Sequence, residues 1–136
     1  MRITLERVLI LKSIDLFSAV PPDALVEVAS ILEEIEVEAG EEILHEGDMG
    51  TAMYIIVDGR VRVHAKGRDI AELGPSEVFG ELAALDPEPR SASVTALEPT
   101  QLFKLSSAPL FELMASYMEV TRGILRVLCR RMRAGL

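Results

Sequence analysis

Two short stretches decide the interpretation of this chain: residues 78–83, Val-Phe-Gly-Glu-Leu-Ala, and residues 90–94, Arg-Ser-Ala-Ser-Val. Gly80 leaves room for backbone N–H groups to approach a phosphate, and Arg90 supplies a guanidinium that can bind the same group. The Glu81 carboxylate can only accept hydrogen bonds, so it suits a sugar hydroxyl. The pattern predicts one pocket for a ligand that carries a phosphate and a sugar.

Glu81 and Arg90 also have simpler explanations. An acid in the first turn of a helix is stabilising without any ligand. Arg90 could be a surface cation or an internal partner of Glu81. Because Arg90 follows Glu81 by nine positions within the flanking pattern, we favour the ligand interpretation.

The residues around these stretches extend the pattern over nearly the whole chain. Residues 79–94 resemble the phosphate-binding cassette of cyclic-nucleotide-binding domains, and residues 39–43, 46–50 and 53–61 resemble the glycine-punctuated strands of that family in order and spacing. The family includes sensor domains of catabolite-activator-type transcription factors, regulatory subunits of cyclic-AMP-dependent kinase and cyclic-nucleotide-gated channels.

The expected fold is mainly β with flanking helices. Alternating apolar residues from residue 34 predict strands, Asp58-Gly59 and Lys66-Gly67 predict hairpin turns, and Thr4 is expected to cap the first helix. The resemblance implies an eight-stranded, jelly-roll-like β-roll. We expect a single domain over 1–136, with N-terminal helices in 1–33, the roll in 34–106, the cassette in 79–92 and C-terminal helices, including a lid helix, in 107–136. The predicted helices cover 4–13, 24–32, 110–114 and 117–133.

The resemblance also implies which residues contact the ligand. In the cassette they are Gly80, Glu81, Leu82, Arg90, Ser91 and Ala92; Ser91 offers a hydroxyl and a backbone N–H, and Ala92 offers a second backbone donor. Val63 and Ile70 are expected to line the pocket around the sugar and base. As β-branched strand residues, they could equally be ordinary residues of the hydrophobic core.

Ser91 also bears on the choice of ligand. In the family a threonine at this position is linked with cyclic GMP, and alanine or serine commonly with cyclic AMP. We therefore expect cyclic AMP in preference to cyclic GMP, and no cofactor.

The last helix carries Arg122, Arg126 and Arg130 at four-residue steps, on one face. Such a stripe is usually solvated. By resemblance, Arg126 or Arg130 could close over the base as a lid, or the stripe could dock on an acidic surface. A lid that stacks an aromatic ring on the base would have to use Tyr117 or a ring from outside the chain.

Two departures from the family pattern support an alternative function. Pro75-Ser76-Glu77 replaces the common Pro-Gly-Asp, so Ser76 is expected to need a positive φ, and Pro87 stiffens a loop position where glycine is common. Some relatives with a similar cassette bind no nucleotide. The alternative is therefore a degenerate, ligand-free interaction domain of a larger transporter, channel or kinase.

Composition narrows the function classes. The chain of 136 residues has 14 basic and 22 acidic side chains, a net charge of −8, and no helix-turn-helix pattern, so we expect no direct DNA binding. A metal-dependent enzyme of the cupin kind would need clustered histidines, and the chain has only His45 and His64, nineteen positions apart, so we expect neither a metal centre nor catalytic residues, and not an enzyme. Cys129 is expected to be half-buried.

Location and partners follow from the same features. No signal or membrane-spanning segment is evident, so we expect a cytoplasmic protein, or a domain at the cytoplasmic face of a membrane protein. The expected partners are a cyclic nucleotide, a fused or docked effector such as a transporter, channel or kinase, and a second copy paired through the C-terminal helix.

Overall fold

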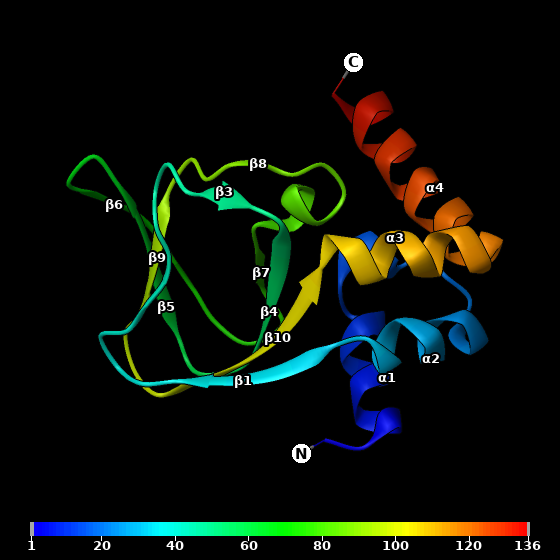
Figure 1. The fold of residues 1–136 in the computed structure, drawn as a ribbon, viewed down its shortest axis with the longest axis horizontal. Coiled ribbons are helices and arrows are strands. Elements are labelled where there is room, and N and C mark those ends of the chain that lie inside the picture. The colour runs from blue at the N-terminus through cyan, green and yellow to red at the C-terminus, as the bar shows by residue number, and fades with distance from the viewer. Residues whose placement is uncertain (1, 136) are drawn as a thin grey trace. The chain divides into compact units, whose positions relative to one another are not determined.

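The structure is a computed structural model that describes residues 2–135, with helices at both ends of the sequence and strands in the middle (Figure 1). Two units are distinguished. The helical unit consists of residues 2–32 and 108–135, and the β unit is Glu33–Ser107.

The β unit contains two four-stranded antiparallel sheets, which confirms the predicted β-roll (Figure 1). One sheet has the order β1 (Glu33–Val37), β10 (Thr100–Ser106), β4 (Ala52–Asp58), β7 (Val78–Phe79). The other has the order β2 (Glu42–Leu44), β9 (Ser93–Ala96), β5 (Val61–Ala65), β6 (Arg68–Leu73). A two-residue ribbon, β3 (Met49–Gly50) with β8 (Glu88–Pro89), brings the number of strands to ten where eight were expected.

The core of the β unit is formed by side chains that alternate along its strands, as the period-two pattern requires. Partly buried apolar residues, Val63 among them, pack against this core. The buried core residues are Val37, Ala52, Tyr54, Ile56, Val61, Phe79, Val94, Ala96 and Leu102.

One predicted hairpin is wrong. Asp58-Gly59 does turn the chain, with φ of 105° at Gly59, but β4 pairs with β10 and β7 whereas β5 pairs with β6 and β9. The turn is therefore a corner between the two sheets. A Cβ at Gly59 would lie 2.7 Å from Thr100 Cα, so only glycine allows the chain to pass so close to the start of β10.

The other predicted turns are confirmed. Lys66 and Gly67 have φ of 53° and 75° and join β5 to β6 in a hairpin. Ser76 has φ of 69°, as expected for a residue that stands where glycine is common. Its N–H donates to the carbonyl of Ile56 at 2.8 Å, which fixes the turn beside β4.

The helical unit begins with α1 (Thr4–Lys12), the 3-10 helix η1 (Asp15–Phe17) and α2 (Pro22–Ser30). Thr4 is the first helical residue and makes no capping bond, so that expectation was wrong. Helix α2 starts two residues earlier than predicted because proline fits the first helical position. Arg7 Nη1 donates to the carbonyls of Ala29 and Leu32 at 3.0 and 3.2 Å, and so caps the end of α2.

The C-terminal part of the sequence forms α3 (Ser107–Ser116), which is longer than the predicted 110–114, and α4 (Met118–Ala134), which agrees with the predicted 117–133 to within one residue at each end. Helix α4 buries Val120, Gly123, Ile124 and Val127, whereas Cys129 is exposed and not half-buried as expected. The thiol lies on the side of α4 away from its buried stripe.

Candidate functional site

The backbone of Arg90 is fixed by the loop that contains β3. Its N–H donates to the carbonyl of Asp48 at 2.7 Å, and its own carbonyl accepts from Gly47 N–H at 2.9 Å. Nearby, the Glu46 N–H donates to Oγ of the buried Ser93 at 2.9 Å. These bonds tie residues 46–48 to both ends of the segment 90–93, so the position of Arg90 depends on a distant part of the sequence.

The Arg90 side chain lies against two glycines. A Cβ at Gly50 would be 2.5 Å from Arg90 Nε, and a Cβ at Gly80 would collide with Arg90 Nη1. Nη2 donates to the carbonyl of Ala52 at 2.7 Å. The guanidinium is therefore held in a narrow slot, where only residues without a side chain leave it room.

Burial dominates the electrostatics of this slot. It lowers the pKa of Arg90 below its ordinary value, while the nearby Tyr54 and Glu88 act in the opposite direction. An arginine remains protonated through such a change. A partly desolvated guanidinium that still has N–H groups able to donate hydrogen bonds can bind an anion strongly, because electrostatic attraction increases where water is excluded.

Gly80 and Glu81 form the other side of the site. Gly80 has φ of 69° and connects β7 to the 3-10 helix η2 (Glu81–Ala84), so its left-handed conformation sets the direction in which Glu81 leaves the strand. Glu81 is half-buried and its Oε1 is shielded from solvent, whereas the Leu82 side chain is exposed. The structure thus brings Gly80 and Arg90 together, and Glu81 directly follows Gly80.

An aromatic pair supports this region. Tyr54 on β4 and Phe79 on β7 are cross-strand neighbours, and their rings stack with centroids 5.2 Å apart and planes 12° apart. Because Phe79 directly precedes Gly80, this stack fixes the end of β7 from which the cassette begins.

The remaining predicted residues differ in their surroundings. Ser91 is exposed and Ala92 is half-buried, directly after Arg90. Val63 pairs with Val94 on β9 and packs against the core of the β unit, whereas Ile70 on the outer strand β6 is 61% exposed. Val63 is therefore an ordinary residue at the edge of the hydrophobic core, whereas Ile70 is not part of the core.

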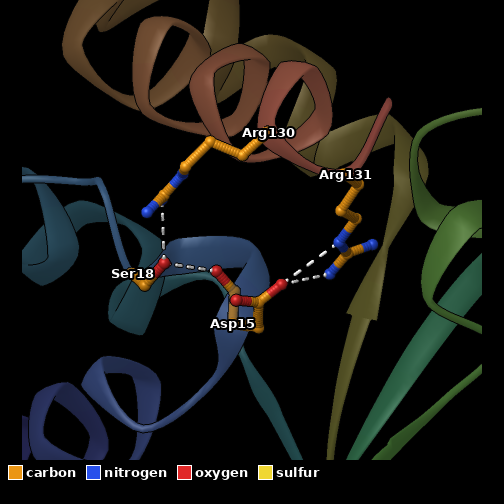
Figure 2. A network of polar contacts seen from close by, with 4 residues as sticks. All are labelled: Asp15, Ser18, Arg130 and Arg131. Atoms are coloured by element: carbon orange, nitrogen blue, oxygen red, sulfur yellow. Dashed lines mark hydrogen bonds and ion pairs between the residues drawn. The ribbon is translucent and has the colours of Figure 1, made fainter. Parts of the chain in front are cut away.

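Arg126 and Arg130 belong to the helical unit. Arg126 is exposed, and Arg130 Nη2 lies 3.4 Å from Ser18 Oγ (Figure 2). Their predicted role as a lid over the base stays a prediction.

Sequence reasoning missed three positions of this site: Gly50, the carbonyl of Ala52, and Ser93. Gly50 was part of the quoted 46–50 segment, but its close approach to Arg90 has no local signature. The carbonyl of Ala52 and the hydroxyl of Ser93 act through long-range hydrogen bonds, which spacing along the chain does not reveal.

Comparison with known proteins agrees with this geometry. The family model described as "Cyclic nucleotide-binding domain" matches residues 34–117, the part of the chain that holds both sheets and the slot of Arg90. The chain belongs to the cyclic-nucleotide-binding domain family. The resemblance inferred from the cassette residues is thereby confirmed.

Two relatives similar to the chain are regulators by name. A CRP-like cAMP-activated global transcriptional regulator from Mycobacterium tuberculosis is 32% identical over 129 residues, covering 91% of this chain and 58% of that protein. A cAMP-dependent protein kinase regulatory subunit from Dictyostelium discoideum is 38% identical over 109 residues, covering 74% of this chain and 32% of that protein. The chain thus spans little more than half the length of the first relative.

A solved structure extends the likeness to nearly the whole chain. The N-terminal domain of a transcriptional regulator from Streptomyces coelicolor A3(2) superposes with a TM-score of 0.88 at 32% identity, covering 93% of this chain and 92% of that one. Among the described residues, no helix has the length and apolar character needed to cross a membrane.

Proposed function

We propose that this chain is a regulatory sensor that binds a cyclic nucleotide, cyclic AMP in preference to cyclic GMP, and transmits binding through movement of the C-terminal helix α4. The observation that carries the proposal is the slot of Arg90 between Gly50 and Gly80. Of the five N–H donors of a guanidinium, the one on Nη2 that faces the Ala52 carbonyl is engaged. The others can bind a phosphate oxygen as a fork.

The second half of the ligand is assigned to Glu81. A carboxylate next to a phosphate site is unfavourable unless it faces a hydrogen-bond donor, and a ribose hydroxyl is such a donor. The shielded Oε1 and the turn at Gly80 support this role. Ser91 and Ala92, which follow Arg90 directly, are proposed to complete the phosphate contacts with a hydroxyl and backbone N–H groups.

The two units are proposed to work as one cyclic-nucleotide-binding domain over residues 1–136, without catalytic activity or a cofactor. Ligand binding shifts α4 only to the extent that affinity differs between two positions of the helix. Arg126 and Arg130 are the proposed lid residues. The chain itself is proposed not to bind DNA, and to act on a fused or docked effector in the cytoplasm or at the cytoplasmic face of a membrane.

Self-association through α4 is part of the proposal. Met118, Leu125 and Met132 are 60%, 53% and 72% exposed, and they follow one another at seven-residue steps. Apolar residues repeated in this way form the seam between paired helices.

A ligand-free interaction domain remains the competing function. In that case Arg90 serves only to tie the cassette to β4 through the Ala52 carbonyl. The two functions predict different effects of added nucleotides on the thermal stability of the chain.

Thermal melting with cyclic AMP, cyclic GMP and AMP distinguishes them. A ligand present at a hundredfold excess over its dissociation constant stabilises the folded state by about 2.7 kcal/mol. We expect the largest shift with cyclic AMP and its loss in Arg90→Gln, because the phosphate contact is worth about 1.5–3 kcal/mol. Arg68→Gln, which removes an exposed arginine of β6, is the matched control. No shift with any of the three nucleotides would favour the ligand-free domain.

A further inference from the structure

The arginines of α4 divide into two groups according to their contacts. Arg131 donates through Nε and Nη2 to Asp15 Oδ2 at 3.1 and 2.8 Å, and Arg130 Nη2 lies 3.4 Å from Ser18 Oγ (Figure 2). Arg122 and Arg126 are exposed and make no hydrogen bond or ion pair with any other residue of 2–135. Their guanidinium groups, like that of Arg133 at the end of the helix, are available to an external partner.

Arg122 and Arg126 line a groove of about 360 Å³ within the helical unit. Residues Ala19 and Pro21 form one wall. The α4 side is lined by Met118, Glu119, Arg122, Gly123 and Arg126. The groove therefore combines two cations with an apolar wall.

The walls of this groove are held in place by contacts on α4. A Cβ at Gly123 would lie 2.7 Å from Val20 Cγ2, so α4 rests directly on the segment that forms the wall. About two turns further along α4, Arg131 binds the Asp15 carboxylate. The backbone carbonyl of Asp15 also accepts a 2.7 Å hydrogen bond from Ser18 Oγ (Figure 2). Little ordering is required when a ligand enters a site whose walls are already fixed.

We propose that this groove is a docking site for an acidic, extended peptide segment of a partner protein. Arg122 and Arg126 are four residues apart on a helix, which places their Cβ atoms about 5–6 Å from each other. In an extended peptide, alternate side chains lie on one face about 6.6–6.8 Å apart. Two carboxylates separated by one residue therefore match the two guanidinium groups, each of which can form a bidentate pair.

The composition of the groove favours a peptide over a nucleic acid. The chain has a net charge of −8, which repels a long polyanion. Glu119 also lines the groove, so a continuous row of phosphates would meet a like charge there. An apolar side chain beside the acids could instead contact Met118 and Pro21.

Fluorescence anisotropy tests the proposal with the full chain and no nucleotide, so the result does not depend on the function of the β unit. The probe is a fluorescein-labelled peptide of roughly eight residues that alternates glutamate and alanine, at an ionic strength of about 0.15 M. The same peptide with glutamine in place of glutamate and an oligothymidylate of similar length are the comparison probes.

The test variant is Arg122→Gln with Arg126→Gln. Its matched control is Arg68→Gln with Arg133→Gln, which removes two other exposed arginines that have no partner among residues 2–135. We expect the glutamate peptide to bind about tenfold more weakly to the test variant and with unchanged affinity to the control. A photo-crosslinking version of the peptide should label residues 19–21 or 118–126 of the unaltered chain, a readout that does not depend on how the variants fold.

Three outcomes would overturn the docking site. They are equal loss of peptide binding in both double variants, crosslinks confined to other segments, and tighter binding of the oligothymidylate than of the glutamate peptide. Failure of the glutamate peptide to bind the unaltered chain would overturn it as well.

Discussion

Replacement of Gly50 by alanine places a methyl group where the Arg90 side chain now lies. The added Cβ would be 2.5 Å from Nε, 2.6 Å from Cζ and 2.8 Å from Cδ of Arg90. Gly50 is not among the residues with positive φ, so alanine fits the backbone there. The strain must be relieved by displacement of the guanidinium, which makes this substitution a selective test of the slot.

The expected magnitudes follow from the contacts that are lost. Displacement breaks the 2.7 Å hydrogen bond from Arg90 to the Ala52 carbonyl, and because the side chain is half-exposed we expect the free energy of unfolding to fall by about 1 kcal/mol. Loss of the phosphate contact should weaken cyclic AMP binding by about 1.5–3 kcal/mol, roughly 10- to 150-fold. Urea denaturation and titration calorimetry measure the two quantities separately.

Gly74→Ala is the matched control. Gly74 also has an ordinary φ, and an added Cβ would meet an arginine at a looser distance, 3.1 Å from Arg60 Nη1. This variant should retain the affinity for cyclic AMP. The two glycine variants thus separate a general loss of flexibility from a clash with the proposed phosphate-binding group.

A double-mutant cycle gives the decisive comparison. In an Arg90→Gln background the shorter side chain no longer fills the slot, so Gly50→Ala should have little further effect on stability or binding. Strictly additive effects of the two substitutions, or unchanged cyclic AMP affinity in Gly50→Ala, would refute the view that Gly50 acts by making room for Arg90.

Three further predictions concern other contacts. Glu81→Gln should weaken binding of cyclic AMP but not of its 2′-deoxy analogue, and calorimetry showing equal losses for both would contradict the hydroxyl assignment. Ser93→Ala leaves the Glu46 N–H without its acceptor and should lower the free energy of unfolding by about 1–2 kcal/mol in urea titrations, whereas an unchanged midpoint would count against a structural role. Asp15→Asn should cost less than about 1 kcal/mol, because the pair with Arg131 is largely exposed; faster amide hydrogen exchange near the end of α4 is the expected sign, and unaltered exchange there would speak against the contact.

The sequence predicted local features of the fold better than strand pairing. The Lys66-Gly67 hairpin follows from residue types and short spacing, and the left-handed Ser76 follows from the family pattern, in which glycine is common at this position; both are confirmed. Asp58-Gly59 carries an equally strong hairpin signal, yet it joins strands of different sheets. A turn dipeptide shows that the chain reverses but not which strand it meets next, because that depends on which faces of the flanking strands are buried.

The same distinction applies to the candidate site. The placement of Gly80 beside Arg90 agrees with what the spacing of the cassette predicted. The contributions of Gly50 and Ala52 depend on the pairing of β3 with β8, which joins segments about forty residues apart. Local chemistry therefore identified the groups proposed to face the ligand, and only the fold revealed the groups that hold Arg90 in position.

The arginines of α4 show why equal spacing does not imply equal roles. One face of the helix carries Arg122, Arg126 and Arg130, and their four-residue spacing does not distinguish one from another. In the structure Arg130 contacts Ser18, whereas the other two line a groove beside Pro21. Since a cation that already has a partner must give it up before it binds another group, Arg122 and Arg126 should respond to an acidic partner first, and a lid movement that recruits Arg130 would have to break its contact with Ser18.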